Sequence, residues 1–134
     1  MLNRLAWLII LLHFLISTVH GMAHLRLGIT LSTFQSTYVL LVITLAPILA
    51  AVLLWARRVR GGFFLLALSM AGSLVFGLYW HYVAESPDNV FHLHEGTLQS
   101  LFRSTALLLA VSEACGVVLG LWGVVRAQNR EPNS

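Results

Sequence analysis

The first apolar segment of the chain carries a stripe of histidines at helical spacing. His13, Ser17, His20 and His24 follow one another at steps of four, three and four residues. Because an α-helix turns by about 100° per residue, the four side chains fall within a stripe about 60° wide. Imidazoles that face lipid are costly, so we expect the stripe to face the interior of a helix bundle. In the simplest alternative the histidines make interhelical hydrogen bonds that only fix packing.

Part of this stripe has the spacing of a metal site. His20 and His24 lie four residues apart, which puts two imidazoles on one helix face, as in helical metal sites. His81, near the end of a later apolar segment, is expected at the same depth and is a candidate third ligand. The loop after it offers further candidates to complete the ligand set: Asp88, His92 and His94. Imidazole and carboxylate ligands suit zinc, copper or iron.

A haem b is the second interpretation of the same histidines. In a four-helix bundle a haem can lie between two histidines on facing helices, and His20 or His24 paired with His81 would serve. With an open coordination position the site would support redox or hydrolytic chemistry, as in a membrane oxidoreductase. A closed shell would be structural or belong to a metal-handling component. The sequence alone leaves both roles open and selects no reaction.

Glu113 is a second polar residue where lipid would be expected. It is the only acid inside an apolar segment, and such a group is a functional-site hypothesis with a partner to be named. Measured from His24 and Phe102, His13 and Glu113 each lie eleven residues deep, about 16 Å along a helix. We therefore expect a hydrogen bond or ion pair between them near the midplane, as part of the same site. The alternative is a protonated Glu113 bonded to a neighbouring backbone or hydroxyl group.

Proton or ion conduction is an alternative function from another class. His24, His20, His13 and Glu113 would form a polar column that descends from one membrane surface to the midplane. Below His13 the first segment is apolar, so the column stops halfway. A complete pathway within one chain is therefore disfavoured.

An accessory subunit of a larger membrane complex, or a homo-oligomer, is a third possibility. Small residues that recur every fourth position let helices approach closely. Two such seams are present, Ser69-Ser73-Gly77 in the third segment and Ser112-Gly116-Gly120 in the fourth.

Near the start of the second segment, Gln35 and Tyr38 are expected to hydrogen-bond the ligand histidines.

Four apolar runs must position these residues. They cover about 5–25, 34–55, 63–83 and 101–125, each close to the roughly 20 residues that a helix needs to cross the hydrocarbon of a bilayer. Unpaired backbone groups are excluded from lipid, so each run must be a helix. Of the 134 residues 58% are hydrophobic and 10% charged, against about a quarter charged in soluble domains. The sequence predicts an all-α membrane protein, an antiparallel bundle of four transmembrane helices in one domain (1–127), with a polar tail (128–134).

The arginines predict the orientation. Most of the eight lie at segment edges, on the side of Arg4, residues 57–60, Arg126 and Arg130, which predicts that this side and both termini are cytoplasmic in a bacterial inner membrane. The arginines form no basic face with interleaved aromatic residues, so the expected partner is the lipid bilayer and not nucleic acid. The single Cys115 excludes an intramolecular disulfide. A competing interpretation takes the first segment as a cleaved signal peptide.

Overall fold

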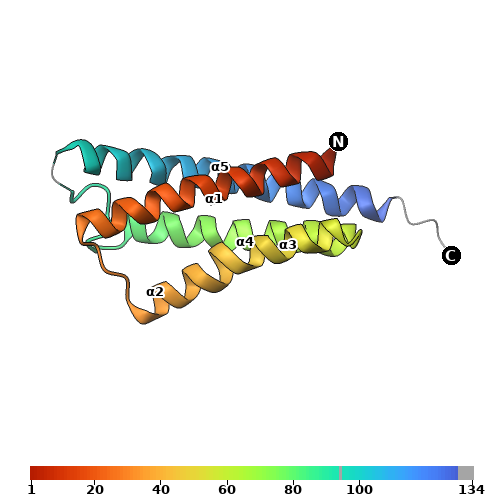
Figure 1. Ribbon diagram of the computed structural model, residues 1–134, viewed down its shortest axis with the longest axis horizontal. Helices are drawn as coiled ribbons and strands as arrows, with labels where there is room; N and C mark the ends of the chain where they lie inside the picture. Colours follow the sequence, from red (N-terminus) through yellow and green to blue (C-terminus); the bar gives the residue numbers. More distant parts are fainter. Residues whose placement is uncertain (94, 130–134) are drawn as a thin grey trace.

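The computed structural model describes residues 1–93 and 95–129, and its regular segments are helices joined by short connections (Figure 1). In chain order these are α1 Leu2–Leu27, α2 Thr33–Tyr38, η1 Val39–Leu45, α3 Ala46–Trp55, α4 Val59–Leu78, η2 Tyr79–Val83 and α5 Thr97–Gln128. The η segments are π-helical and continue the α-helices beside them. Four continuous spans result, each long and apolar enough to cross a membrane: Leu2–Leu27, Thr33–Trp55, Val59–Val83 and Thr97–Gln128. The predicted all-helical membrane fold is confirmed.

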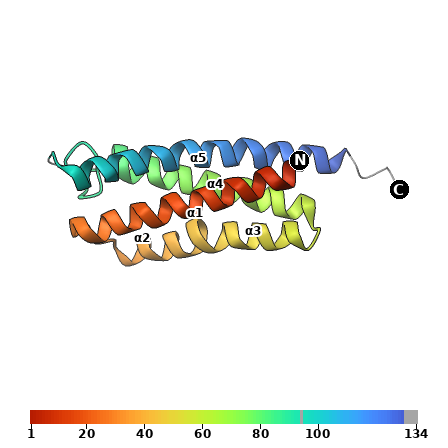
Figure 2. The same cartoon turned by 45° about the horizontal axis from the view of Figure 1, so that its top comes forward.

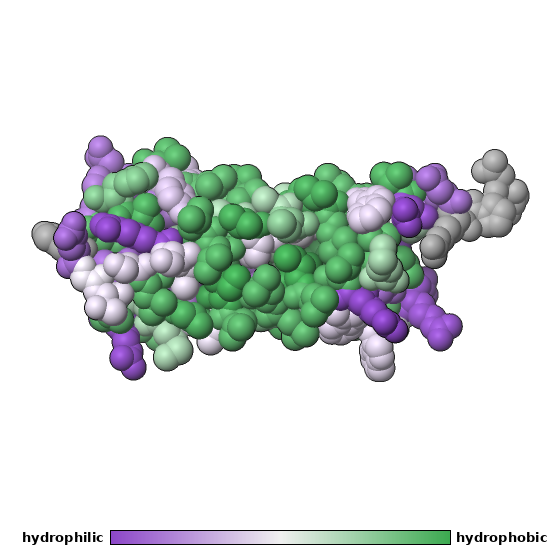
Figure 3. Space-filling model, turned by 90° about the horizontal axis from the view of Figure 1, so that it is seen from above, coloured by the Kyte–Doolittle hydropathy of each residue, from purple (hydrophilic) through white to green (hydrophobic). Residues whose placement is uncertain are grey.

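Successive spans run in opposite directions (Figures 1 and 2). The connection at residues 28–32 and the loop at 84–96 lie at one end of the molecule, which we call the loop end. Hydrophobic side chains cover the middle of the visible face, and hydrophilic residues gather at both ends (Figure 3). Such a surface suits a bilayer, so the chain is a multi-pass membrane protein.

The small residues of α5 lie directly against α4. A Cβ atom built on Gly120 would lie 2.7 Å from the backbone nitrogen of Ala67, and one on Gly116 would lie 2.7 Å from a carbon of Met70. Only glycine allows this approach, because any side chain would displace the facing helix. The small-residue seam of α5 is therefore filled inside the chain, and it does not point to a partner subunit.

The second span diverges from the rest of the bundle at the loop end. Figure 1 shows α2 turning away from α1, while α3 returns to α4 at the other end. The phenolic hydroxyl of Tyr38 donates to the carbonyl of Gly72, 3.2 Å away, and so ties the second span to α4. A Cβ atom at Gly72 would lie 3.0 Å from this hydroxyl oxygen, so glycine makes room for the contact.

Pro47 accounts for an irregularity in the same span. Proline has no N–H, so the carbonyl of Ile43, four residues earlier, lacks its α-helical donor. The chain is π-helical through this stretch, Val39–Leu45. The freed carbonyl faces α1 and accepts from His13 Nε2 at 3.2 Å. A proline in one span thereby provides the hydrogen-bond acceptor for an imidazole in another.

Candidate metal centre

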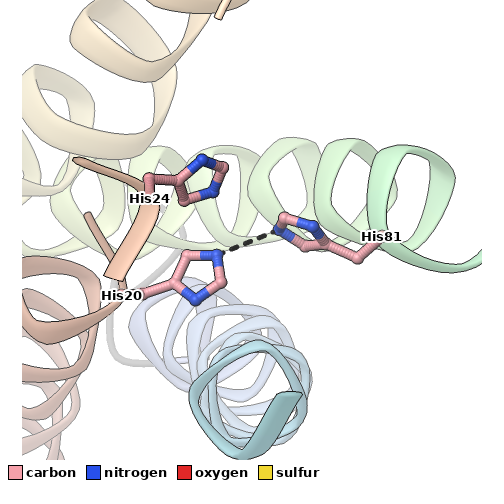
Figure 4. Close-up of side chains that lie close together, drawn as sticks. All are labelled: His20, His24 and His81. Atoms are coloured by element: carbon pink, nitrogen blue, oxygen red, sulfur yellow. Dashed lines mark hydrogen bonds between the residues drawn. The ribbon is translucent and has the colours of Figure 1, made fainter. Parts of the chain in front are cut away.

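Three imidazoles from two spans meet near the loop end. His20 and His24 come from successive turns of α1, and His81 comes from the π-helical end of the third span. One ligand nitrogen from each lies within 4.8 Å of the other two. Figure 4 shows the three rings turned toward one another. The predicted meeting of histidines from separate spans is therefore present, and the group is able to hold a metal ion.

Thr105 on α5 determines the tautomer of His20. Its hydroxyl lies 2.8 Å from the carbonyl of Leu101 and 3.0 Å from that of Phe102, the usual acceptors for a threonine within a helix. The single hydroxyl proton is thus directed at the backbone, and the oxygen is left to accept. With the threonine proton on the backbone, His20 Nδ1, which lies 2.8 Å from this oxygen, is the donor. In the neutral ring, His20 Nε2 then carries a free lone pair.

Asp88 determines the tautomer of His81 in the same way. His81 Nδ1 lies 3.1 Å from the backbone carbonyl of Asp88, which can only accept, so Nδ1 carries the proton. His81 Nε2 is then also a free lone pair. The two Nε2 atoms of His20 and His81 face each other at 3.2 Å (Figure 4). With this pair of tautomers the two lone pairs converge on a common position, whereas a proton on either Nε2 would make the direct hydrogen bond drawn in Figure 4.

The first part of the loop, residues 84–93, is fixed in place by hydrogen bonds to the third span, within the loop and to α5. The amide of Val90 donates to the carbonyl of His81 at 3.0 Å, and the side chain of Asn89 donates to the carbonyl of Ala84 at 2.9 Å. Arg103 Nε on α5 donates to the carbonyl of Val90 at 2.9 Å. These bonds hold the intervening Asp88 over the imidazoles.

The carboxyl group of Asp88 is buried next to the cluster. Its Oδ1 lies 3.2 Å from His24 Nε2 and 3.9 Å from His81 Nδ1. Burial raises the pKa of Asp88 to about 6. Neutral pH still lies above this value, so the group is mainly ionised and puts a negative charge beside the imidazoles. Within the described residues, Asp88 Oδ1 and His24 Nδ1 are buried and have no hydrogen-bond partner. Buried polar atoms without partners are costly, so these two atoms are open to a further contact.

Phe102 closes one side of the cluster. Its ring centroid lies 4.6 Å from that of His20, 4.9 Å from that of His24 and 5.4 Å from that of His81. A haem would have to place its macrocycle between the rings of His20 and His81, where the two nitrogens are 3.2 Å apart. As arranged here, the two rings leave no space for a macrocycle between these nitrogens.

The deeper pair predicted from the sequence is also brought together. His13 Nδ1 lies 3.7 Å from Glu113 Oε1, and both residues are buried. Because His13 Nε2 donates to the carbonyl of Ile43, the neutral ring turns an unprotonated Nδ1 toward the carboxyl group. At 3.7 Å the two atoms are too far apart for a direct hydrogen bond, so the predicted pair is a close approach of two buried polar groups.

Other predicted site residues are placed differently. The side chain of His92 is exposed on the loop and does not belong to the three-histidine group, and His94 lies outside the described residues. Gln35 and Tyr38 were expected to hydrogen-bond the histidines, but the bonds recorded for them lie elsewhere. The side chain of Gln35 closes a capping box with Ser32, and Tyr38 bonds α4.

Fold and cluster together define a class of protein, a multi-pass helical membrane protein with a largely buried group of three imidazoles close enough together to hold a metal ion. Compared with protein-family models, with curated proteins and with solved structures, the chain matches none. Its function is therefore inferred from the geometry of its own residues.

Proposed function

We propose that the chain is a metal-binding membrane protein in which His20, His24 and His81 ligate one zinc, copper or iron ion. The facing Nε2 lone pairs of His20 and His81 carry this proposal. In a tetrahedral site with metal–nitrogen bonds of about 2.0–2.1 Å, two ligand nitrogens lie about 3.3 Å apart. The 3.2 Å separation fits that value. Asp88 supplies a negative charge that offsets the charge of the ion.

The surroundings of the cluster support an ion that arrives from water. A cavity of about 370 Å³ at the loop end is lined partly by polar residues and reaches Asp88. Its polar lining includes Thr30, Gln35 and Ser86, which a hydrated ion can contact as it loses water. Three imidazoles leave one position open in a four-coordinate site, the arrangement used by catalytic metal centres. This open position favours a membrane enzyme, of the oxidoreductase or hydrolase type, over a closed structural site.

Conduction of protons or ions across the membrane receives less support. Below His13 and Glu113 the interior is an apolar cluster that includes Ile10, Leu54, Phe63, Leu66 and Met70. The buried hydroxyl group of Ser69 lies beside this core, but it donates to the carbonyl of Leu66, so the described residues offer no continuous chain of polar groups for a proton. We therefore assign His13 and Glu113 to the same site as the three-histidine cluster and not to a conduction pathway.

The test is the metal content of purified protein. His20→Ala and His81→Ala each remove one lone pair, and His92→Ala removes an exposed imidazole as the matched control. We expect about one ion per chain in the unaltered protein and in His92→Ala after reconstitution with zinc, copper or iron, because their ligands are intact. The two cluster variants should lose that ion.

Size-exclusion chromatography in detergent will show whether the variants stay assembled. Equal metal content in His20→Ala, His81→Ala and His92→Ala would contradict the proposal, and so would an unaltered protein that binds none of the three metals. In that case a proton between His20 and His81 is the better account. An absorption spectrum of the same samples tests for haem. A Soret band would show that the bound group is haem b and not a single ion.

A further inference from the structure

A cavity extends from the three imidazoles into the membrane-spanning region. Its volume is about 460 Å³, within the range of about 300–1,000 Å³ that is usual for small-molecule sites. It reaches from His24 and Asp88 at the loop end to Ser17 and Glu113 near the middle of the bundle. Along α1 this is a depth of about 10 Å.

The cavity has mainly apolar walls, and its ionisable groups are confined to two places. The walls are mainly apolar, with Ile29, Leu31, Val39, Ile43, Phe76 and Leu109 among them. The ionisable groups lie at two depths, the imidazoles with Asp88 at the loop end and Glu113 deeper in. Gly77 lies between them: a Cβ atom there would be 3.9 Å from His81 and 4.0 Å from Glu113 Oε2. Glycine at this position leaves both groups open to the same space.

The cavity opens toward the bilayer between the first and second spans. Gly21 and Leu25 on α1 and Ser36 on α2 line it and are exposed, and α2 diverges from α1 at this level (Figure 1). A Cβ atom on Gly21 would meet nothing within 4 Å. A molecule dissolved in the lipid can therefore reach the cavity without crossing the aqueous loop end.

These features restrict the chemistry of the occupant. A strongly polar molecule would lose its hydration against the apolar walls, which is unfavourable. A pure hydrocarbon would offer no hydrogen bond to the carboxyl group of Glu113 or to His24 Nδ1, which has no partner among the described residues. A molecule with an apolar body and one hydrogen-bonding head group satisfies both.

We propose that this cavity binds a lipid-soluble molecule with an aliphatic chain and a hydroxyl or carbonyl head group, which arrives sideways from the bilayer between α1 and α2. The chain lies against the apolar walls, and the head group lies between Glu113 and the three imidazoles. Binding of this molecule does not require the ion. That it is the substrate of the metal centre rests on the function proposed above.

The test uses photolabelling of the full chain in lipid nanodiscs. The probe is a ten-carbon alcohol that carries a diazirine on its chain, and the labelled residues are mapped by mass spectrometry. We expect labelling on the cavity walls formed by 21–25 of α1 and 39–43 of η1. An excess of 1-decanol should suppress it at least fivefold, whereas an excess of decane should have little effect because it has no head group.

Gly21→Phe closes the gap with a side chain that meets no neighbour at its Cβ, and Gly21→Leu is a smaller version of the same change. Gly61→Phe is the matched control, because Gly61 is exposed at the other end of the bundle and its Cβ would meet only Leu53, at 4.0 Å. Wall labelling should fall at least fivefold in the Gly21 variants and persist in Gly61→Phe.

Labelling spread over the lipid-facing surface, unchanged by Gly21→Phe and Gly21→Leu, would overturn the inference. Competition by decane as strong as that by decanol would overturn the role of the head group. Metal content measured in the same samples separates the two proposals. Wall labelling in a chain that binds no metal after reconstitution refutes the metal centre alone, and metal binding without wall labelling refutes the lipid-soluble ligand alone.

Discussion

The hydroxyl group of Thr105 decides which nitrogen of His20 is free. It accepts from Nδ1 because its own proton is directed at the backbone of α5, and Nε2 is thereby turned toward His81. The backbone carbonyl of Asp88 does the same for His81. In metal sites, partners of this kind fix the orientation and the tautomer of the ligand ring. In the proposed metal site the two rings are therefore held in place by contacts within the protein.

Thr105→Val tests this arrangement, since valine has a similar shape and no hydroxyl group. We expect metal affinity to fall by about 10–100-fold, the usual effect of losing a hydrogen-bond partner of a ligand histidine. The measurement is competition with a chelator of known affinity. Thr18→Val is the control, because Thr18 also bonds its own helix, at the carbonyl of Phe14, but is exposed. An equal loss of affinity in both variants would contradict the role given to Thr105.

Among individual residues, the sequence predicts the histidine cluster better than the groups that hydrogen-bond it. The spacing of His20 and His24 in an apolar segment singles them out, and depth along the helices brings in His81. Thr105 carries no such signal, because a threonine in a membrane helix normally bonds its own backbone. The carbonyl of Asp88 belongs to the backbone, so only the path of the loop reveals its contact with His81.

Helix α5 packs on α4 through glycines that leave no room for a side chain. The Cβ of an alanine at position 120 would lie 2.7 Å from the backbone nitrogen of Ala67, so the two helices would have to separate. Contacts of this kind hold membrane helices together, since lipid supplies no hydrophobic force between them. The stability of the bundle therefore depends on a surface away from the histidines.

Gly120→Ala should lower the free energy of unfolding by about 1–3 kcal/mol, the usual cost of overpacking. Gly61→Ala is the control, because its Cβ contacts only Leu53, at an ordinary distance. Unfolding in mixed micelles with increasing denaturing detergent gives the comparison. Equal stability of the two variants would show that α4 and α5 can adjust at no cost.

The sequence predicts where the four spans lie but not their irregularities. Apolar length alone sets the spans to within a few residues, because backbone groups must be paired in lipid. The hydropathy pattern does not reveal the π-helical stretches at Val39–Leu45 and Tyr79–Val83. Pro47 is a signal for the first of them, since it removes a donor, but it does not tell which side chain will use the freed carbonyl. The divergence of α2, which opens the cavity, is a property of packing.

The charge pattern of the whole molecule predicts how it lies in the membrane. Arginines at the end opposite the loop end are expected on the cytoplasmic side. Glu85→Cys and Arg58→Cys, each in a Cys115→Ala background, place one thiol at an exposed position at each end. In spheroplasts we expect an impermeant maleimide to label Glu85→Cys at once and Arg58→Cys only after the membrane is opened. The opposite pattern would put the loop end in the cytoplasm and reverse the side from which an ion arrives.

The contacts of His20 also bear on how the protein is made. Synthesis proceeds from the N-terminus, and the hydroxyl group that accepts from His20 lies 85 residues further along the chain. The first span therefore enters the bilayer with three imidazoles that no later helix has yet covered. Until α5 is inserted, the growing chain exposes polar rings that membrane proteases and insertases can recognise. A chain cut short before residue 97 should be degraded, whereas full-length chains persist.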